Sequence, residues 1–102
     1  MRPSLTAKRA ETLIRKLAER SQNVVFSHHA MLRMEQRTIS LMDVFNVLTK
    51  GFVEATPKPA KSHGEWVCKV VRHARGNRDI GVITILIREE RLFIKTVEWE
   101  DL

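Results

Sequence analysis

The sequence contains little cysteine and no long apolar run, and both shortages exclude classes of protein. Its 102 residues include a single cysteine, Cys68, so no disulfide can form within the chain and a reducing compartment is expected. No apolar stretch approaches the roughly 20 residues that a membrane-spanning helix needs. The first residues lack the apolar segment of a signal peptide. We therefore expect a cytoplasmic protein with no membrane association.

Motifs for cofactors and metal ions are missing as well. The four glycines form no glycine-rich phosphate loop, and no two carboxylates have a spacing that suggests acid–base chemistry. The four histidines and the cysteine show neither the C-x-x-C nor the H-x-x-x-H spacing of zinc sites. His28 and His29 are adjacent, so on a helix they diverge by about 100°. We expect no metal and no cofactor.

Positive charge is what the sequence has in excess. Eighteen lysines and arginines against 12 acidic residues give a net charge of +6, which favours a polyanionic partner such as nucleic acid or an acidic protein. Residues 1–20 and 51–78 each carry +4, whereas residues 79–102 carry −3. The length and the apolar fraction of 43% suit one globular domain over residues 1–102.

Apolar spacing predicts three helices in the first half of the chain. Apolar residues recur at steps of three and four over Ser4–Arg20. A helix of about ten residues follows between the N-cap serine Ser27 and Ser40, which opens a third helix over Leu41–Lys50. The short apolar stretch Val24–Phe26 is interpreted as a connector.

After Gly51 the apolar period changes to that of strands, and four are predicted: Phe52–Thr56, Glu65–Arg72, Ile80–Ile87 and Leu92–Trp99. The third is apolar on both faces, which is typical of a central strand. The first is ended by Pro57 and Pro59, which suits an edge. The predicted fold class is α+β, with three N-terminal helices over residues 1–50 packed on a four-stranded antiparallel meander over residues 51–102.

The helix after Ser27 holds the candidate chemistry. His29, Arg33 and Arg37 are spaced at i, i+4 and i+8, so they share one helix face. Arginine side chains can hold a phosphate bidentately, and a neutral imidazole can take a proton from a ribose 2′-hydroxyl. The alternative interpretation is a solvated basic face without chemistry.

Further basic residues would extend this site along a nucleic acid. Lys69, Arg72, His73 and Arg75 lie in the second positive block and are predicted to line an RNA path. A helix-turn-helix with Leu41–Lys50 as the recognition helix is a weaker alternative, because that helix offers few polar side chains to base edges.

The same stretch resembles a family signature. His29-Ala30-x-x-Arg33-Met34-x-x-Arg37-x-Ile39-Ser40 is similar to the H-A-x-x-R-M-x-x-R-G-I-S pattern of the bacterial domain-of-unknown-function 4258 family, and the resemblance covers roughly residues 24 to 99. Thr38 stands where that pattern usually has glycine, so the turn there is expected to differ. Thr96 matches a threonine that the family commonly carries in its last strand.

That family is similar to the RelE, MqsR and colicin ribonuclease superfamily of small α+β toxins. The resemblance implies a RelE-like toxin fold, metal-independent cleavage of RNA by attack of a 2′-hydroxyl on the neighbouring phosphate, and an antitoxin partner. It carries over His29, Arg33, Arg37 and Thr96 as catalytic residues. The chain has no tyrosine, so tyrosine-based chemistry of any relative is not transferable.

The leading hypothesis is therefore an endoribonuclease of a bacterial toxin–antitoxin pair, acting on free or ribosome-bound RNA. The alternative is a non-catalytic domain that uses the same basic surface to bind nucleic acid or a protein.

Overall fold

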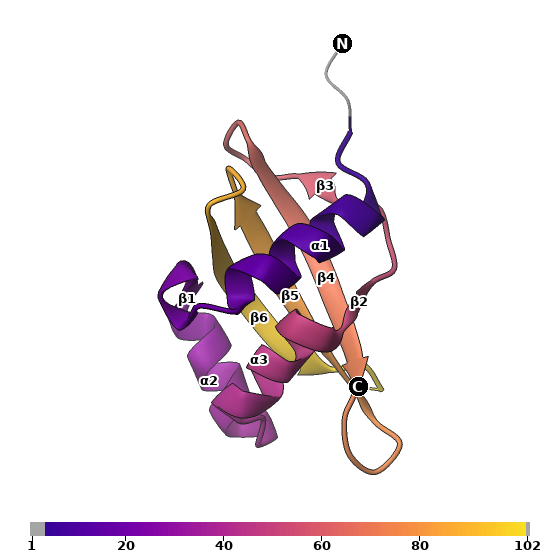
Figure 1. The fold of residues 1–102 in the computed structure, drawn as a ribbon. Coiled ribbons are helices and arrows are strands. Elements are labelled where there is room, and N and C mark those ends of the chain that lie inside the picture. The colour runs from indigo at the N-terminus through magenta and orange to yellow at the C-terminus, as the bar shows by residue number, and fades with distance from the viewer. Residues whose placement is uncertain (1–3, 102) are drawn as a thin grey trace.

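The computed structural model describes residues 4–101 as three helices and a six-stranded sheet (Figure 1). The helices are α1 (Ala7–Ala18), α2 (His28–Arg37) and α3 (Leu41–Lys50), and a short 3₁₀ helix, η1 (Ser21–Asn23), follows α1. The strands are β1 (Val24–Phe26), β2 (Phe52–Val53), β3 (Lys58–Pro59), β4 (Glu65–His73), β5 (Asp79–Ile87) and β6 (Arg91–Trp99).

The sheet is mixed and larger than the predicted four-stranded meander, so the predicted fold class is wrong in its architecture. The strand order is β1-β6-β5-β4-β2, and β3 also pairs with β4. The stretch Val24–Phe26, interpreted as a connector, is a strand parallel to β6, so the helices do not all precede the strands. Three residues are too few to show a strand period, and their partner strand lies at the far end of the chain.

The edge strand is also shorter than predicted. Of Phe52–Thr56, only Phe52 and Val53 pair with β4. Pro57 cannot donate a ladder hydrogen bond, and the chain resumes pairing at Lys58, opposite Val67. The central position predicted for Ile80–Ile87 is confirmed, because β5 lies between β4 and β6 along its whole length.

The core lies between one face of the sheet and the helices α1 and α3, which cross that face in Figure 1. Ala10, Ile14 and Ala18 of α1 are buried at steps of four, as their spacing predicts. Thr6 is the N-cap of this helix, since its side chain accepts a hydrogen bond from the Arg9 backbone N–H. The opposite face of the sheet has no helix across it in this view, and we call it the uncovered face.

Helix α2 ends in a paired-hydrogen-bond motif centred on Thr38. The Ile39 N–H donates to the Met34 carbonyl at 2.9 Å and the Thr38 N–H donates to the Glu35 carbonyl at 3.4 Å, which is the pattern of a Schellman cap. Ile39 is buried. This cap places Thr38 at φ 55° and ψ 46°, the left-handed region in which a β-branched residue is strained. The turn thus keeps the glycine conformation although glycine is absent.

Replacing Thr38 by glycine is expected to stabilise the protein. A non-glycine residue in the left-handed region costs the folded state roughly 1–2 kcal/mol, and glycine removes this cost. Glycine also makes the unfolded chain more flexible, which lowers the gain in stability by about 0.4–1 kcal/mol. We expect Thr38→Gly to raise the free energy of unfolding, measured in urea, by about 0.5–1 kcal/mol. Thr38→Ala keeps a Cβ at the strained position, so a gain as large in that control would contradict this explanation.

Candidate functional site

Helix α2 takes the place of a strand along one edge of β6. Strand β1 ends at Phe26, opposite Ile94, so the remainder of this edge of β6 has no strand beside it. The Ser27 hydroxyl donates to the Lys95 carbonyl at 2.9 Å, and Arg37 Nη1 donates to the Val97 carbonyl at 2.9 Å. Side chains from the two ends of α2 therefore satisfy the edge carbonyls that a neighbouring strand would otherwise pair.

Two residues at the ends of this segment each have two structural roles. The Ser27 hydroxyl also accepts from the Ala30 N–H at 2.9 Å, which makes it the N-cap predicted from sequence. The backbone carbonyl of Arg37 accepts from the Trp99 indole N–H at 2.9 Å. Helix α2 is thus held to β6 at its N-cap and at its last residue, and the side chains between them have a defined position.

His29 and Arg33 lie together on the exposed flank of α2. Arg33 Nε is 3.5 Å from His29 Nε2, and Arg33 Nη1 donates to Gln36 Oε1 at 3.0 Å. His29 is exposed and Arg33 is half-buried. In this arrangement a guanidinium group and an imidazole nitrogen face the same small volume of solvent.

The other flank of α2 faces α3. Met31 and Met34 line an apolar hollow of about 220 Å³ together with Phe26 and Leu41. His29 lies about 160° around the helix from Met31, so it faces away from α3. The His29–Arg33 pair therefore opens to solvent beside the β6 edge, on the side of α2 away from α3.

Thr96 is near this edge but is not bonded to the pair. It is half-buried, and it lies in one cross-strand row with Ile83 and Lys69 on the uncovered face of the sheet. Among the residues described, Thr96 makes no hydrogen bond with His29 or with either arginine. Its chain neighbour Val97 is the residue whose carbonyl Arg37 binds.

Three of the four residues predicted to line an RNA path already have acidic partners. Lys69 Nζ is 2.6 Å from Glu100 Oε1 and 3.9 Å from Glu98 Oε1. His73 Nδ1 is 3.1 Å from Asp79 Oδ1. Arg75 binds Asp43 and the Thr38 carbonyl, and its guanidinium lies 5.7 Å from the centre of the Trp99 ring.

Arg72 is different from the other three. Successive residues of a strand point to opposite faces, so Lys69 and His73 lie on the uncovered face while Arg72 lies on the side of α3. It borders a hollow of about 170 Å³ that Asn46 and Lys50 also line. Arg72 makes no ion pair within residues 4–101. The four residues therefore do not form one row, and Arg72 is the member with an available charge.

Sequence reasoning missed two polar contacts that hold the helices in place. Buried Glu11 of α1 accepts from the Val53 N–H at 2.9 Å and lies 3.7 Å from Arg15. Asp43 forms the capping box of α3 with Ser40 and pairs with Arg75 at 3.3 Å. The sequence predicted that Ser40 opens α3, but it indicated neither the contact of Glu11 with Val53 nor that of Asp43 with Arg75.

Asp43 links helix α3 to the loop after β4 electrostatically. Burial by itself raises the pKa of this carboxyl, but hydrogen bonding with Ser40 and the positive charge of Arg75 outweigh it. The pKa of Asp43 is consequently lowered below its ordinary value of 3.8. Ionised Asp43 therefore stabilises the folded state above that value, and this stabilisation is lost as the pH falls through the lower folded-state pKa.

Removing the Arg75 charge is expected to weaken this acid dependence. In Arg75→Gln the folded-state pKa of Asp43 moves back toward its unfolded value, so less stability depends on its ionisation. We expect the free energy of unfolding, followed between about pH 5 and pH 2, to fall less steeply than in the wild type. If the free energy of unfolding of the two proteins falls equally steeply between about pH 5 and pH 2, Arg75 does not lower the pKa of Asp43.

Cys68 is not a reactive thiol. It lies on the covered face of β4, and burial raises the pKa of its thiol to about 11. Within residues 4–101 no group of three histidine, cysteine or acidic side chains is arranged to hold a metal ion. None of the three helices described combines the length and the apolar character needed to cross a bilayer.

The comparisons with known proteins agree with the signature around His29. Neither the curated proteins nor the solved structures include a match to this chain. A family model described as "Domain of unknown function (DUF4258)" matches residues 26–99, which is most of the chain and includes α2 and all of β6. On that match the chain belongs to the DUF4258 family.

Proposed function

We propose that the protein is a metal-independent endoribonuclease of the toxin type, which acts on RNA in the cytoplasm and is inhibited by an antitoxin protein. The observation that carries this proposal is the pairing of His29 Nε2 with the Arg33 guanidinium at 3.5 Å on an exposed flank of α2. We further propose that the family is related to ribonuclease toxins, and this relation would support nuclease activity by analogy.

The chemistry follows from the two side chains. When RNA binds, His29 Nε2 exchanges its long contact with Arg33 Nε for the ribose 2′-hydroxyl. In its neutral form His29 takes the proton of that hydroxyl through Nε2, and the 2′-oxygen attacks the adjacent phosphorus. Arg33 donates hydrogen bonds to the phosphate oxygens, on which negative charge develops. The bond from phosphorus to the 5′-oxygen breaks, and that oxygen takes a proton from water. The hydroxide so formed takes the proton back from His29, which restores the base. The products are a 2′,3′-cyclic phosphate and a free 5′-hydroxyl.

Arg37 has a positioning role in this scheme. Its guanidinium is bound to the Val97 carbonyl, so it holds α2 against β6 and thereby places His29 and Arg33. We still predict that Thr96 forms a hydrogen bond with the substrate. Thr96 is next in the chain to Val97, whose carbonyl binds Arg37, and it matches a threonine common in the last strand of the family.

The test is cleavage of RNA by the purified protein, with and without ribosomes, scored for a 2′,3′-cyclic phosphate end. A chelator should leave the rate unchanged, because no step uses a metal ion. Wild-type protein that binds RNA but never produces a cyclic end, with or without ribosomes, would refute the catalytic part of the proposal.

Binding of RNA should depend strongly on salt. Each phosphate that a basic side chain neutralises releases counterions, so affinity falls as salt rises. We expect Arg72→Ala to make this salt dependence shallower by about one unit of slope, because Arg72 has no acidic partner. Lys69→Ala is the control, since Glu98 and Glu100 already neutralise that charge.

The measurement is a salt titration with an oligonucleotide whose riboses lack the 2′-hydroxyl, so that binding is observed without cleavage. A flat salt dependence for the wild type would point to a protein or small-molecule partner instead.

A second candidate function is a non-catalytic binding domain. The observation in its favour is that the Arg37 guanidinium binds the Val97 carbonyl, which leaves one arginine rather than two beside His29 for chemistry on a phosphate. Such a domain would bind nucleic acid or a protein through the same surface, and no variant would show cleavage.

A further inference from the structure

Two hollows meet at Trp66, at the end of the sheet opposite to the α2 contacts. One has a volume of about 480 Å³ and the other about 360 Å³, and both are lined by Gly64 and Trp66. Trp66 is in register with Leu86 of β5 and, through it, with Leu92 of β6. Since Leu92 is five residues from Val97, Trp66 lies about 17 Å along the strands from the contact between Arg37 and β6.

Gly64 allows the tight turn beside these two hollows. Gly64 has φ +81°, a conformation that other residues rarely adopt, and its carbonyl accepts from the Arg88 N–H at 2.9 Å. A Cβ at position 64 would lie 3.4 Å from Arg88 Cγ, so the Arg88 side chain passes directly beside this glycine. The tight turn thus brings an arginine from the β5–β6 turn to the rim of the hollow that contains Trp66.

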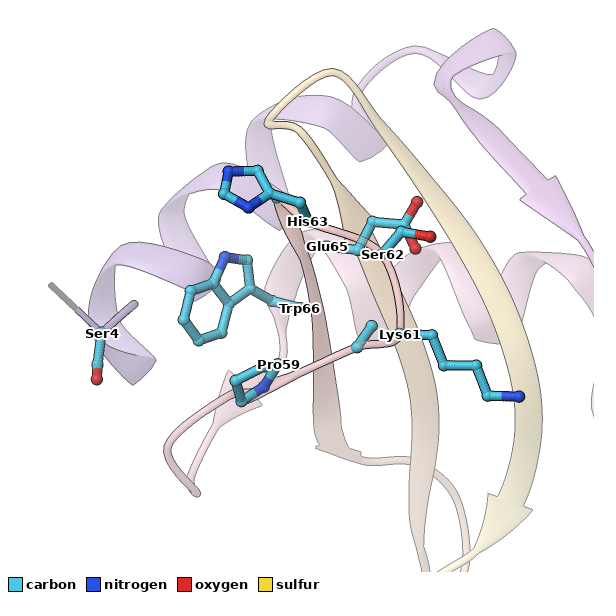
Figure 2. A pocket seen from close by; sticks show the side chains of 9 residues that line it. Ser4, Pro59, Lys61, Ser62, His63, Glu65 and Trp66 are labelled. Carbon is cyan, nitrogen blue, oxygen red and sulfur yellow. The ribbon is translucent and has the colours of Figure 1, made fainter. Parts of the chain in front are cut away.

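Figure 2 shows how the side chains of the larger hollow lie. The Trp66 ring stands on one side of β4 with the His63 ring above it, Pro59 below it and Ser4 across from it. Lys61 and Glu65 point to the other side of the strand. The hollow therefore presents the flat Trp66 ring between the His63 ring and Pro59, and the Glu65 carboxylate points away from it.

The two tryptophans of the chain have different environments. Trp99 is buried, its indole N–H is bound to the Arg37 carbonyl, and Arg78 lies 4.1 Å from the centre of its ring. Trp66 is half-buried, and its indole N–H makes no hydrogen bond within the described part of the chain. Trp66 therefore keeps an open ring face and a donor that a ligand can use.

The charges around Trp66 favour an anionic ligand. Arg88 is exposed and makes no ion pair with any described residue. Arg9 and Glu89 also line the smaller hollow, but they bind each other at 3.1 Å and so offset one another. The available charge at this rim is the single positive charge of Arg88.

We infer that Trp66 is a stacking site for one unpaired base of single-stranded RNA, with Arg88 binding the adjoining phosphate. This inference rests on the proposed function, because it assigns a second contact to the same substrate. A single indole with one arginine suits a base and its phosphate, since stacking on an aromatic ring is open to every base. A proline-rich peptide would instead need a groove lined by several aromatic rings.

The test uses a short single-stranded oligo(2′-deoxyadenylate), which cannot be cleaved by 2′-hydroxyl attack. We expect the oligonucleotide to quench the fluorescence of Trp66, and Trp66→Leu to abolish the quenching while Trp99 still fluoresces. The same variant should lose about ten-fold in affinity, the usual effect of one stacked base. Arg88→Ala should also weaken binding and make its salt dependence shallower.

The matched control is Phe52→Leu, which removes an aromatic ring that also has a nearby arginine but lines neither of the two hollows at Trp66. Arg15 lies 5.9 Å from the centre of the Phe52 ring, and the ring is 59% exposed. This variant should bind like the wild type. Equal loss in the two variants would mean that any exposed ring contributes, and would overturn the inference.

The outcomes separate this inference from the proposed function. If the wild type cleaves RNA but Trp66→Leu binds normally without a change in quenching, the stacking site is refuted and the nuclease stands. If His29→Ala and the wild type are equally inactive yet the oligonucleotide quenches Trp66, the stacking site stands and the nuclease is refuted. Quenching by a proline-rich peptide and not by the oligonucleotide would overturn the inference.

Discussion

His29→Ala is expected to reduce RNA cleavage by about 10²–10⁴-fold, the usual contribution of a general acid–base group. Affinity for an uncleavable oligonucleotide should change little, because the imidazole transfers a proton and does not neutralise a phosphate. Stability should change by less than about 0.5 kcal/mol, since His29 is exposed and its contact with Arg33 is long. Cleavage rates and affinities of the purified variant and wild type test this prediction.

The chain offers an adjacent control in His28. It is also exposed and lies in the same first turn of α2, but its side chain points about 100° away from that of His29. His28→Ala should therefore cleave RNA at the wild-type rate. If both histidine variants keep full activity, or if both lose it equally, the assignment of the base to His29 is wrong.

The helical part of the site could be read from the sequence because it depends on local chemistry. Ser27 and Ser40 were predicted as caps from side chains that bind the backbone three residues away, and both bonds are present. The spacing of His29 and Arg33 predicted a shared flank, and they lie there. Such features involve residues within one or two helical turns, which is the range over which sequence patterns are informative.

The rest depends on pairings between distant parts of the chain. Nothing in Val24–Phe26 indicates that these residues pair with β6, and without that strand the edge beyond Ile94 is not defined. The contact of Arg37 with Val97 exists only because of that edge. The partners of Lys69 and Arg75 were equally unpredictable, because charge along the sequence does not show which opposite charges meet across strands.

This limit bears directly on Arg37. By spacing alone it is a third phosphate-binding residue, whereas its hydrogen bond to the Val97 carbonyl gives it a structural role. The two roles predict different effects of replacing Arg37. If the guanidinium mainly satisfies the β6 edge, Arg37→Ala leaves that carbonyl without its charged donor, and hydrogen bonds to charged groups contribute about 1.5–3 kcal/mol.

We therefore expect Arg37→Ala to lower the free energy of unfolding by about 2 kcal/mol, measured by urea denaturation. Arg33→Ala is the matched control on the same helix, because the Arg33 contacts are on the solvent-exposed flank. It should unfold at nearly the wild-type urea concentration but cleave RNA poorly. Arg37→Lys retains a charged donor and should recover part of the lost stability.

Cleavage by Arg37→Ala must be measured at a temperature at which the variant is folded. Under that condition we expect activity between those of the wild type and Arg33→Ala, because α2 keeps its Ser27 contacts with β6 while its C-terminal end is released. If Arg37→Ala is as stable as the wild type and loses cleavage as completely as Arg33→Ala, then Arg37 binds the phosphate itself. In that case its contact with Val97 must be exchanged for one with RNA when the substrate binds.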